Sequence, residues 1–192
     1  MRSQTSLAAV LIGLMVSVSG PAMAAKGFSY SYADVGYLAT DGDELEVDSV
    51  LVDASFGVFE YVALRGGFRR GSVNDFPGDS PDLTEFRVGA RGHYTLLKKL
   101  DVYADAIYFN SKLNGNQTTQ TDIGGIYEAG LRYQLAKKFE LDASYRHVSG
   151  EIDADFLVVG GILDVTKNIS LNLNGAFADE DNEYFAGIRI GF

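Results

Sequence analysis

Polar and apolar residues alternate through most of this chain, and the stretch Leu83–Tyr94 has the clearest pattern. Alternate positions form two sets, each called a parity below. One parity consists of Glu85, Arg87, Gly89, Arg91 and His93, and the other consists of Phe86, Val88, Ala90, Gly92 and Tyr94. A period of two is typical of extended strands whose successive side chains face opposite sides. Because the apolar parity ends in aromatics and the polar parity is charged, the pattern predicts a barrel whose apolar face meets lipid.

The alternation recurs in ten segments. The connections between these segments alternate between short and long along the chain. The short connections fall near Gly57, Leu97, Lys137 and Thr166. Short turns at one end and longer loops at the other are typical of outer-membrane barrels. The sequence therefore predicts an all-β fold, a transmembrane antiparallel up-and-down β-barrel of ten strands, with eight as the alternative. The expected strands are Phe28–Ala39, Glu46–Phe56, Tyr61–Arg70, Leu83–Thr95, Asp101–Asn110, Ile123–Leu135, Glu140–Ser149, Asp155–Leu163, Ile169–Ala178 and Glu183–Phe192.

Aromatic residues of the apolar parity gather at its two edges, with an aliphatic band between them. Phe56, Tyr94 and Tyr133 fall near the short turns, whereas Tyr37 and Tyr145 fall toward the long loops. Aromatic rings favour both membrane interfaces, so two such belts indicate lipid. A two-sheet sandwich is the alternative, although it predicts no such edges.

Two segments depart from strict alternation. Phe156–Leu163 is apolar on both faces, and the first segment changes phase between Tyr32 and Val35. A β-bulge would explain the phase change in the first strand.

The N-terminus has the features of an export signal. Arg2 precedes the uncharged apolar run Leu7–Val18, and Ala22–Ala24 supplies the small residues that signal peptidase reads. We expect residues 1–24 to be a cleaved signal peptide and residues 25–192 to be the barrel domain. An uncleaved membrane anchor is the alternative. The chain has no cysteine, which excludes disulfides and lipoprotein processing.

The chain is acidic, with a formal net charge of −10. Nucleic acid is an unsuitable partner for such a chain, because phosphate binding requires patches of Lys and Arg. Most lysines sit in the expected short turns, while acidic clusters sit in the segments between the other strand ends. These acids are Asp41, Asp43, Glu44, Glu46, Asp75, Asp79, Asp82, Glu151, Asp153, Asp155, Asp179, Glu180, Asp181 and Glu183.

The inward parity carries a nearly balanced set of charges. Arginine suits bidentate pairing with carboxylates in a confined space, and a narrow barrel can be filled by its own side chains. Balanced charge therefore favours a hydrogen-bonded plug, whereas an open selective pore is expected to carry a ring of one sign. The expected interior network consists of Asp34, Asp53, Arg65, Arg69, Glu85, Arg87, Arg91, Asp105, Glu128, Arg132, Asp142, Arg146 and Arg189.

The C-terminal residues resemble the signal that outer-membrane barrels present to the assembly machinery. Phe192 is the terminal aromatic, Ile188 and Ile190 alternate before it, and Gly187 lies five positions back. The pattern departs from that signal at Phe185, where a polar residue is usual.

The residue patterns bear on three kinds of site chemistry. His147, Ser149 and Glu151 could form a lipid-facing hydrolase site, since a base near a hydroxyl can activate it. A barrel protease is disfavoured by the short strands and by His93 lying near the turn end. The acidic loops lack the spacing of a calcium site. We therefore expect a non-enzymatic protein with no catalytic residue, no cofactor and no metal.

Several segments together resemble a family of small proteobacterial outer-membrane barrels. These are Phe28–Tyr37, in which an aromatic-rich start runs into an acidic residue and Gly-Tyr, then Phe86–Ala90, Tyr127–Arg132 and Tyr184–Phe192. The chain is also broadly similar to attachment and opacity barrels. The resemblance implies a surface-exposed protein of outer membranes and vesicles, with roles such as adhesion, biofilm formation or signalling.

The expected function is therefore structural or interactive at the surface of a Gram-negative bacterium. We expect a monomer whose partners are outer-membrane lipid, lipopolysaccharide and the barrel-assembly machinery. A narrow passive channel and a lipid A-modifying hydrolase are the alternatives.

Overall fold

The structure is a computed structural model that describes residues 28–42, 46–74, 80–115, 119–151, 153–179 and 181–192. The expected signal peptide of residues 1–24 lies outside the described residues and stays a prediction. The acidic loop residues Asp43, Glu44, Asp75, Asp79 and Glu180 also lie outside them.

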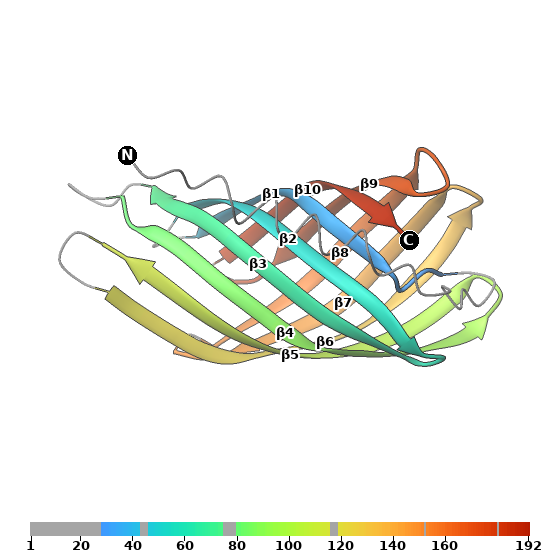
Figure 1. Cartoon of the computed structure of the whole chain (residues 1–192), viewed down its shortest axis with the longest axis horizontal. Coiled ribbons are helices and arrows are strands. Elements are labelled where there is room, and N and C mark those ends of the chain that lie inside the picture. The colour runs from blue at the N-terminus through green and yellow to red at the C-terminus, as the bar shows by residue number, and fades with distance from the viewer. Residues whose placement is uncertain (1–27, 43–45, 75–79, 116–118, 152, 180) are drawn as a thin grey trace.

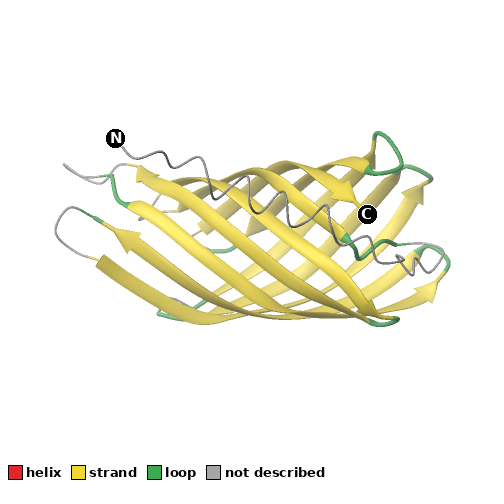
Figure 2. Ribbon diagram, viewed as in Figure 1, coloured by secondary structure: helices red, strands yellow, loops and turns green. Residues whose placement is uncertain are grey.

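The described residues form ten antiparallel strands, as the alternation predicted. Each strand pairs with the next along the chain, and β1 pairs with β10, which closes the barrel. Figures 1 and 2 show the strands running obliquely around a single wall. The strands are β1 Tyr32–Gly42, β2 Glu46–Phe59, β3 Val62–Asn74, β4 Asp82–Leu97, β5 Leu100–Asn114, β6 Thr119–Ala136, β7 Phe139–Ser149, β8 Ala154–Asp164, β9 Ile169–Phe177 and β10 Asp181–Gly191.

The outward face of the barrel is apolar, because the strand parities fall as expected. Leu131 on β6, Leu173 on β9 and Ile188 on β10 are exposed, as are the aromatic residues at both edges of the band. These exposed rings include Tyr37, Phe86, Tyr108, Tyr127, Tyr145 and Tyr184 toward one end and Tyr94, Tyr133 and Phe192 toward the other. This arrangement matches a wall that contacts lipid between two interfaces.

The first expected strand is wrong at its start. Strand β1 begins at Tyr32 rather than at Phe28, and it pairs with both neighbours without a register shift. The bulge that would explain a phase change between Tyr32 and Val35 is therefore absent from β1. Tyr32 is a buried residue of the inward parity, whereas Val35 is exposed on the outward parity, so the apparent phase change is an inward-facing aromatic side chain.

Other boundaries shift by a few residues, because the strands reach farther than the apolar band. Strand β6 spans 18 residues and β4 spans 16. Strand β2 continues through Gly57, with a register irregularity before Phe59, so the tight turn falls at Glu60–Tyr61. The tight turns joining β2 to β3 and β4 to β5 lie at the same end of the barrel, on the right in Figure 1.

Strand β8 is apolar on both faces, and the structure explains why. Phe156, Val158 and Ile162 face inward and are buried, while Leu157 and Leu163 face outward and are exposed. Strand β8 therefore supplies an apolar wall to the lumen opposite strands that supply charges.

Candidate functional site

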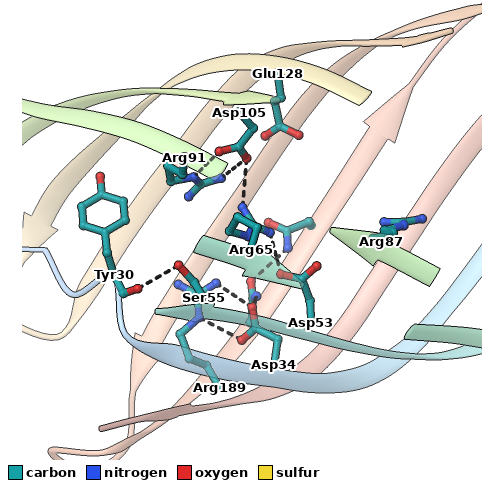
Figure 3. A network of polar contacts seen from close by, with 12 residues as sticks. Tyr30, Asp34, Asp53, Ser55, Arg65, Arg87, Arg91, Asp105, Glu128 and Arg189 are labelled. Carbon is teal, nitrogen blue, oxygen red and sulfur yellow. Dashed lines mark hydrogen bonds and ion pairs between the residues drawn. The ribbon is translucent and has the colours of Figure 1, made fainter. Parts of the chain in front are cut away.

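The lumen holds the thirteen predicted charges, and its central cluster joins β2, β3, β4 and β5. Asp105 accepts hydrogen bonds from Arg91 Nε at 2.7 Å and Arg91 Nη2 at 2.6 Å. It also accepts one from Arg65 Nη1 at 2.9 Å, while Arg65 Nη2 donates to Asp53 at 2.6 Å. Figure 3 shows this chain of residues crossing the interior. Planar guanidinium groups therefore link neighbouring strands from inside the barrel.

A second cluster lies at the seam where the barrel closes. Arg189 on β10 donates two hydrogen bonds to Asp34 on β1, at 2.8 and 2.7 Å. Asn172 on β9 donates a third to the same carboxylate at 3.1 Å. The guanidinium also lies 3.7 Å from the ring centroid of Tyr32. The first and last strands are thus joined by a bidentate ion pair as well as by their backbone ladder.

A third cluster spans the lumen through Glu183, which the sequence analysis placed at the start of the last expected strand but grouped with the acids of the preceding connection. That grouping is wrong, because Glu183 faces the lumen from β10. Its carboxylate accepts from Arg146 on β7 at 2.9 Å and lies 3.8 Å from Arg69 on β3. Arg146 also donates to Glu128 on β6 at 2.9 Å. This row of charges, Glu128–Arg146–Glu183–Arg69, connects strands on opposite sides of the barrel.

The residues before β1 enter the lumen at the tight-turn end. Phe28 and Tyr30 are buried there, and the guanidinium of Arg132 lies 4.9 and 5.0 Å from their ring centroids. Arg132 also donates to the Ser29 carbonyl at 3.3 Å, and Ser55 donates to the Tyr30 carbonyl at 2.8 Å. Residues Phe28–Ser31 therefore form a stopper, the name used below for this segment.

Tyr30 is the most heavily contacted side chain of the stopper. Its ring stacks on His93 with 3.6 Å between ring centroids, and its hydroxyl donates to Asp101. Asp101 is fully buried, at 0% exposure. Sequence reasoning missed Asp101 and Glu140, the partner of Arg132 at 2.5 Å, although both lie on the inward parity with Asp105 and Asp142.

Three predicted charges have other kinds of contact. Glu85 and Arg87 pair with each other along the same strand, two residues apart. Asp142 accepts a hydrogen bond from the Tyr103 hydroxyl at 2.9 Å, and the same hydroxyl also lies 2.9 Å from Glu128. Tyr103 was another inward residue that the charge-based prediction overlooked.

A cavity of about 150 Å³ lies within these clusters. Its wall is charged on one side, with Arg65 and Arg91, and apolar on the other, with Val158, Ile162 and Phe185. Figure 3 shows Arg87, which also lines the cavity, standing apart from the main network. The lumen is thus divided into a paired polar part and an apolar part.

The C-terminal strand carries the predicted assembly signal on two faces. Ile188, Ile190 and Phe192 are exposed on the outward face, and the Phe192 ring lies 6.5 Å from that of Phe56. Gly187 faces inward. A Cβ on Gly187 would lie 2.6 Å from the Phe185 ring, so the glycine leaves room for this aromatic side chain where the usual signal has a polar residue.

The hydrolase candidate has a different geometry from the expected one. His147 Nδ1 lies 2.8 Å from Asp155 on the neighbouring strand, not beside Glu151. The Glu151 carboxylate instead accepts from the Gln120 amide at 2.8 Å. The carboxylate next to the imidazole is therefore Asp155, and the grouping of His147 with Glu151 on which the hydrolase alternative depends is not formed.

Among the residues that the structure describes, no group of three or more His, Cys, Asp or Glu is arranged to hold a metal ion. Within the same ranges, no helix is both long and apolar enough to cross a membrane.

Comparisons with known proteins place this fold. A model of the outer membrane protein beta-barrel domain matches residues 8–177, whereas no curated protein matches the chain significantly. The translocator domain of autotransporter NalP from Neisseria meningitidis is similar at 11% identity, covering 96% of each chain, with a TM-score of 0.54. The NanC porin is similar at 11% identity, covering 83% of this chain and 100% of its own, with a TM-score of 0.53.

Neisserial surface protein A is also similar, at 16% identity over 84% of this chain and 95% of its own, with a TM-score of 0.44. At these identities the NalP and NanC structures show a shared fold and nothing finer. The family match covers most of the sequence, and the closed barrel with its apolar outer wall agrees with it. The chain therefore belongs to the outer-membrane β-barrel proteins, the class that resides in the outer membrane of Gram-negative bacteria.

Proposed function

We propose that the protein is a monomeric outer-membrane barrel with a closed lumen, and that its role is structural or interactive at the cell surface. Adhesion, biofilm formation and envelope integrity are the roles that this proposal covers. The row of charges from Arg69 through Glu183 to Arg146 carries it, because these contacts cross the lumen instead of lining it. A channel for solutes requires an unobstructed path.

The lumen has two separate closures in this proposal. The stopper Phe28–Ser31 fills the tight-turn end, and the Glu183 row crosses the barrel toward the loop end. Each ionic group in the row has a partner of opposite sign, so opening the lumen would leave charges in a confined space without compensation. This cost favours the closed state.

Conductance in planar lipid bilayers tests the closed lumen directly. We expect the purified, folded protein to give no steady open state, because both closures must part before ions can pass. Insertion is checked in the same preparation by protease resistance of the reconstituted barrel. A steady conductance from the unmodified protein would contradict the proposal.

A narrow passive channel is the second candidate, and the internal cavity of about 150 Å³ favours it. In a passive channel, the cavity would be one segment of a path through the lumen, and the stopper and the Glu183 row would open transiently. The bilayer measurement separates the two candidates, since brief and repeated openings would support the channel.

The hydrolase alternative predicts that His147 is essential, whereas the proposed function predicts that it is dispensable. We expect His147→Ala to leave the acyl content of lipid A unchanged in cells that make the protein, because no described contact joins His147 to Glu151. Mass spectrometry of extracted lipid A is the measurement, with cells lacking the protein as the reference. Loss of an acyl-chain change in the variant would establish the enzyme.

A further inference from the structure

Arg70 and Lys112 differ from the other cations of the barrel in the direction that they face. Both are exposed on the outward parity, in the loop-end halves of β3 and β5. In the described part of the chain, the remaining arginines face the lumen. The remaining lysines of that part lie in tight turns, at residues 98, 99, 137, 138 and 167. Two cations therefore lie on the outer wall near its loop end, next to the apolar band.

The strand register brings these two cations into one row. Arg70 lies opposite Thr84 on β4, and Thr84 lies opposite Lys112 on β5. Adjacent strands lie about 4.8 Å apart, so the backbones carrying the two cations are separated by about 10 Å. The Thr84 hydroxyl lies between them on the same face.

Aromatic residues indicate the depth of this row in the membrane. Phe68 and Phe86 lie one outward position closer to the middle of the barrel wall, and their ring centroids are 4.9 Å apart. Girdles of aromatic residues flank the apolar band of outer-membrane barrels at both membrane interfaces. The row of Arg70, Thr84 and Lys112 therefore lies at the depth of lipid headgroups.

The surroundings of the row are open. A hollow of about 260 Å³ lies beside Arg70 on the outer surface, with Tyr37 and Val50 also lining it. The ion pairs found among the described residues involve neither Arg70 nor Lys112. Both cations are thus available to a ligand from the membrane.

Two carboxylates border this surface. Asp48 accepts hydrogen bonds from the Tyr37 hydroxyl and from Asn74 Nδ2, the latter at 2.8 Å. Asp82 is exposed, lies two residues from Thr84 and also lines the hollow. Asp48 is occupied by its donors, whereas Asp82 would repel a bound anion.

We propose that Arg70, Thr84 and Lys112 bind a phosphate ester of an outer-leaflet glycolipid, namely the phosphorylated headgroup of lipopolysaccharide. The guanidinium group can donate two parallel hydrogen bonds to phosphate oxygens, and the ammonium group supplies a second positive charge. The inference uses the orientation usual in outer-membrane barrels, with the short turns on the periplasmic side and the long loops at the cell exterior, and it rests on the proposed function only for placement at the cell surface.

Native mass spectrometry of the full-length, folded protein in detergent micelles tests the proposal with diphosphoryl lipid A as the probe. Each cation at headgroup depth contributes about 1 kcal/mol, so Arg70→Gln with Lys112→Gln is expected to weaken binding roughly 30-fold. The matched control, Lys98→Gln with Lys99→Gln, removes the same charge in a tight turn and should leave the affinity unchanged. Asp82→Asn should tighten binding severalfold, because a repelling carboxylate is removed.

Three results would overturn the proposal. These are unchanged affinity in the Arg70 and Lys112 variant, an equal loss in the Lys98 and Lys99 control, and equal binding of dephosphorylated lipid A. Inorganic phosphate is a further probe. If it competes as strongly as lipid A at the same concentration, the ligand is free phosphate and the assignment to a membrane lipid is wrong.

The orientation is tested separately in cells. An epitope tag inserted after Ser80 should be accessible to antibody from outside, and a tag between Lys137 and Lys138 should not. Reversed labelling with phosphate-dependent binding retained in micelles would refute the proposed placement of the row in the outer leaflet, and with it the lipopolysaccharide assignment. Correct labelling without such binding would refute the lipid site alone.

Discussion

Asp105→Asn is expected to lower the free energy of unfolding by about 3–5 kcal/mol, because it leaves the buried Arg91 without its carboxylate and leaves Arg65 paired with Asp53 alone. Asp105 accepts from Arg91 at 2.7 and 2.6 Å and from Arg65 at 2.9 Å, and its side chain is 1% exposed. An amide of the same shape keeps one acceptor oxygen, but it cannot balance the charge, and its NH2 group faces a guanidinium donor. The substitution therefore removes the ion pairing together with some of the hydrogen bonds.

Urea unfolding in lipid vesicles, followed by circular dichroism, measures this effect. Asp41→Asn is the matched control, since Asp41 is exposed on β1 and its change should stay within about 0.5 kcal/mol. A loss below about 1 kcal/mol for Asp105→Asn would mean that the arginines are hydrated in the lumen instead of paired.

Opening both closures together is expected to turn a closed barrel into a conducting one. The combination of Phe28→Ala, Tyr30→Ala and Glu183→Ala removes the stopper rings and the carboxylate that bridges Arg69 and Arg146. Either closure by itself should still block the lumen, so the stopper variant and the Glu183 variant should each remain closed. Planar-bilayer recording of the three proteins measures the difference.

The control for this experiment is Phe59→Ala, because Phe59 is 75% exposed beside a tight turn and does not enter the lumen. Folding of each variant is checked by its heat-dependent mobility in gel electrophoresis. If the folded triple variant does not conduct, other lumenal residues close the barrel. If the Glu183 variant conducts by itself, the stopper is not a closure.

The alternation of residue types made the barrel and its two faces predictable from the sequence. Arg87, Arg91 and Glu85 share a parity, and that parity alone places them inside once Phe86 and Val88 face lipid. The same argument would have found Glu183, which shares the parity of Arg189 on β10. It was missed because an acid near other loop acids suggests a solvated tip.

The stopper could not be predicted from the two-residue alternation of the sequence. Phe28, Tyr30 and Tyr32 alternate with small polar residues, so they have the same pattern as a strand. What separates them is pairing, since β10 ends opposite Tyr32 and beyond it the Phe192 amide donates a single backbone hydrogen bond to the Ser31 carbonyl. The chain can then turn inward, where Arg132, His93 and Asp101 provide contacts for the two rings. Such long-range contacts leave no local signal in the sequence.

Phe185 stands where the C-terminal assembly signal usually has a polar residue, and its place also depends on long-range contacts. Its ring occupies lumenal space that depends on the missing side chains of Gly36 and Gly187 on paired strands. A Cβ at Gly36 would lie 2.4 Å from the backbone oxygen of Ala186, so this close approach permits glycine alone. The role of either glycine can be recognised only when the register of the paired strands is known.

Power-saturation electron paramagnetic resonance on β9 offers the most direct view of which wall meets hydrocarbon. The chain has no native cysteine, so spin labels can be attached singly at Ser170, Leu171, Asn172 and Leu173 in reconstituted vesicles. Labels at Leu171 and Leu173 should collide readily with oxygen dissolved in lipid, whereas labels at Ser170 and Asn172 should be shielded from both oxygen and a water-soluble nickel chelate. Strong nickel collisions at Ser170 and Asn172, or oxygen accessibility without a period of two, would contradict a lipid-facing apolar wall around a closed, ion-paired interior.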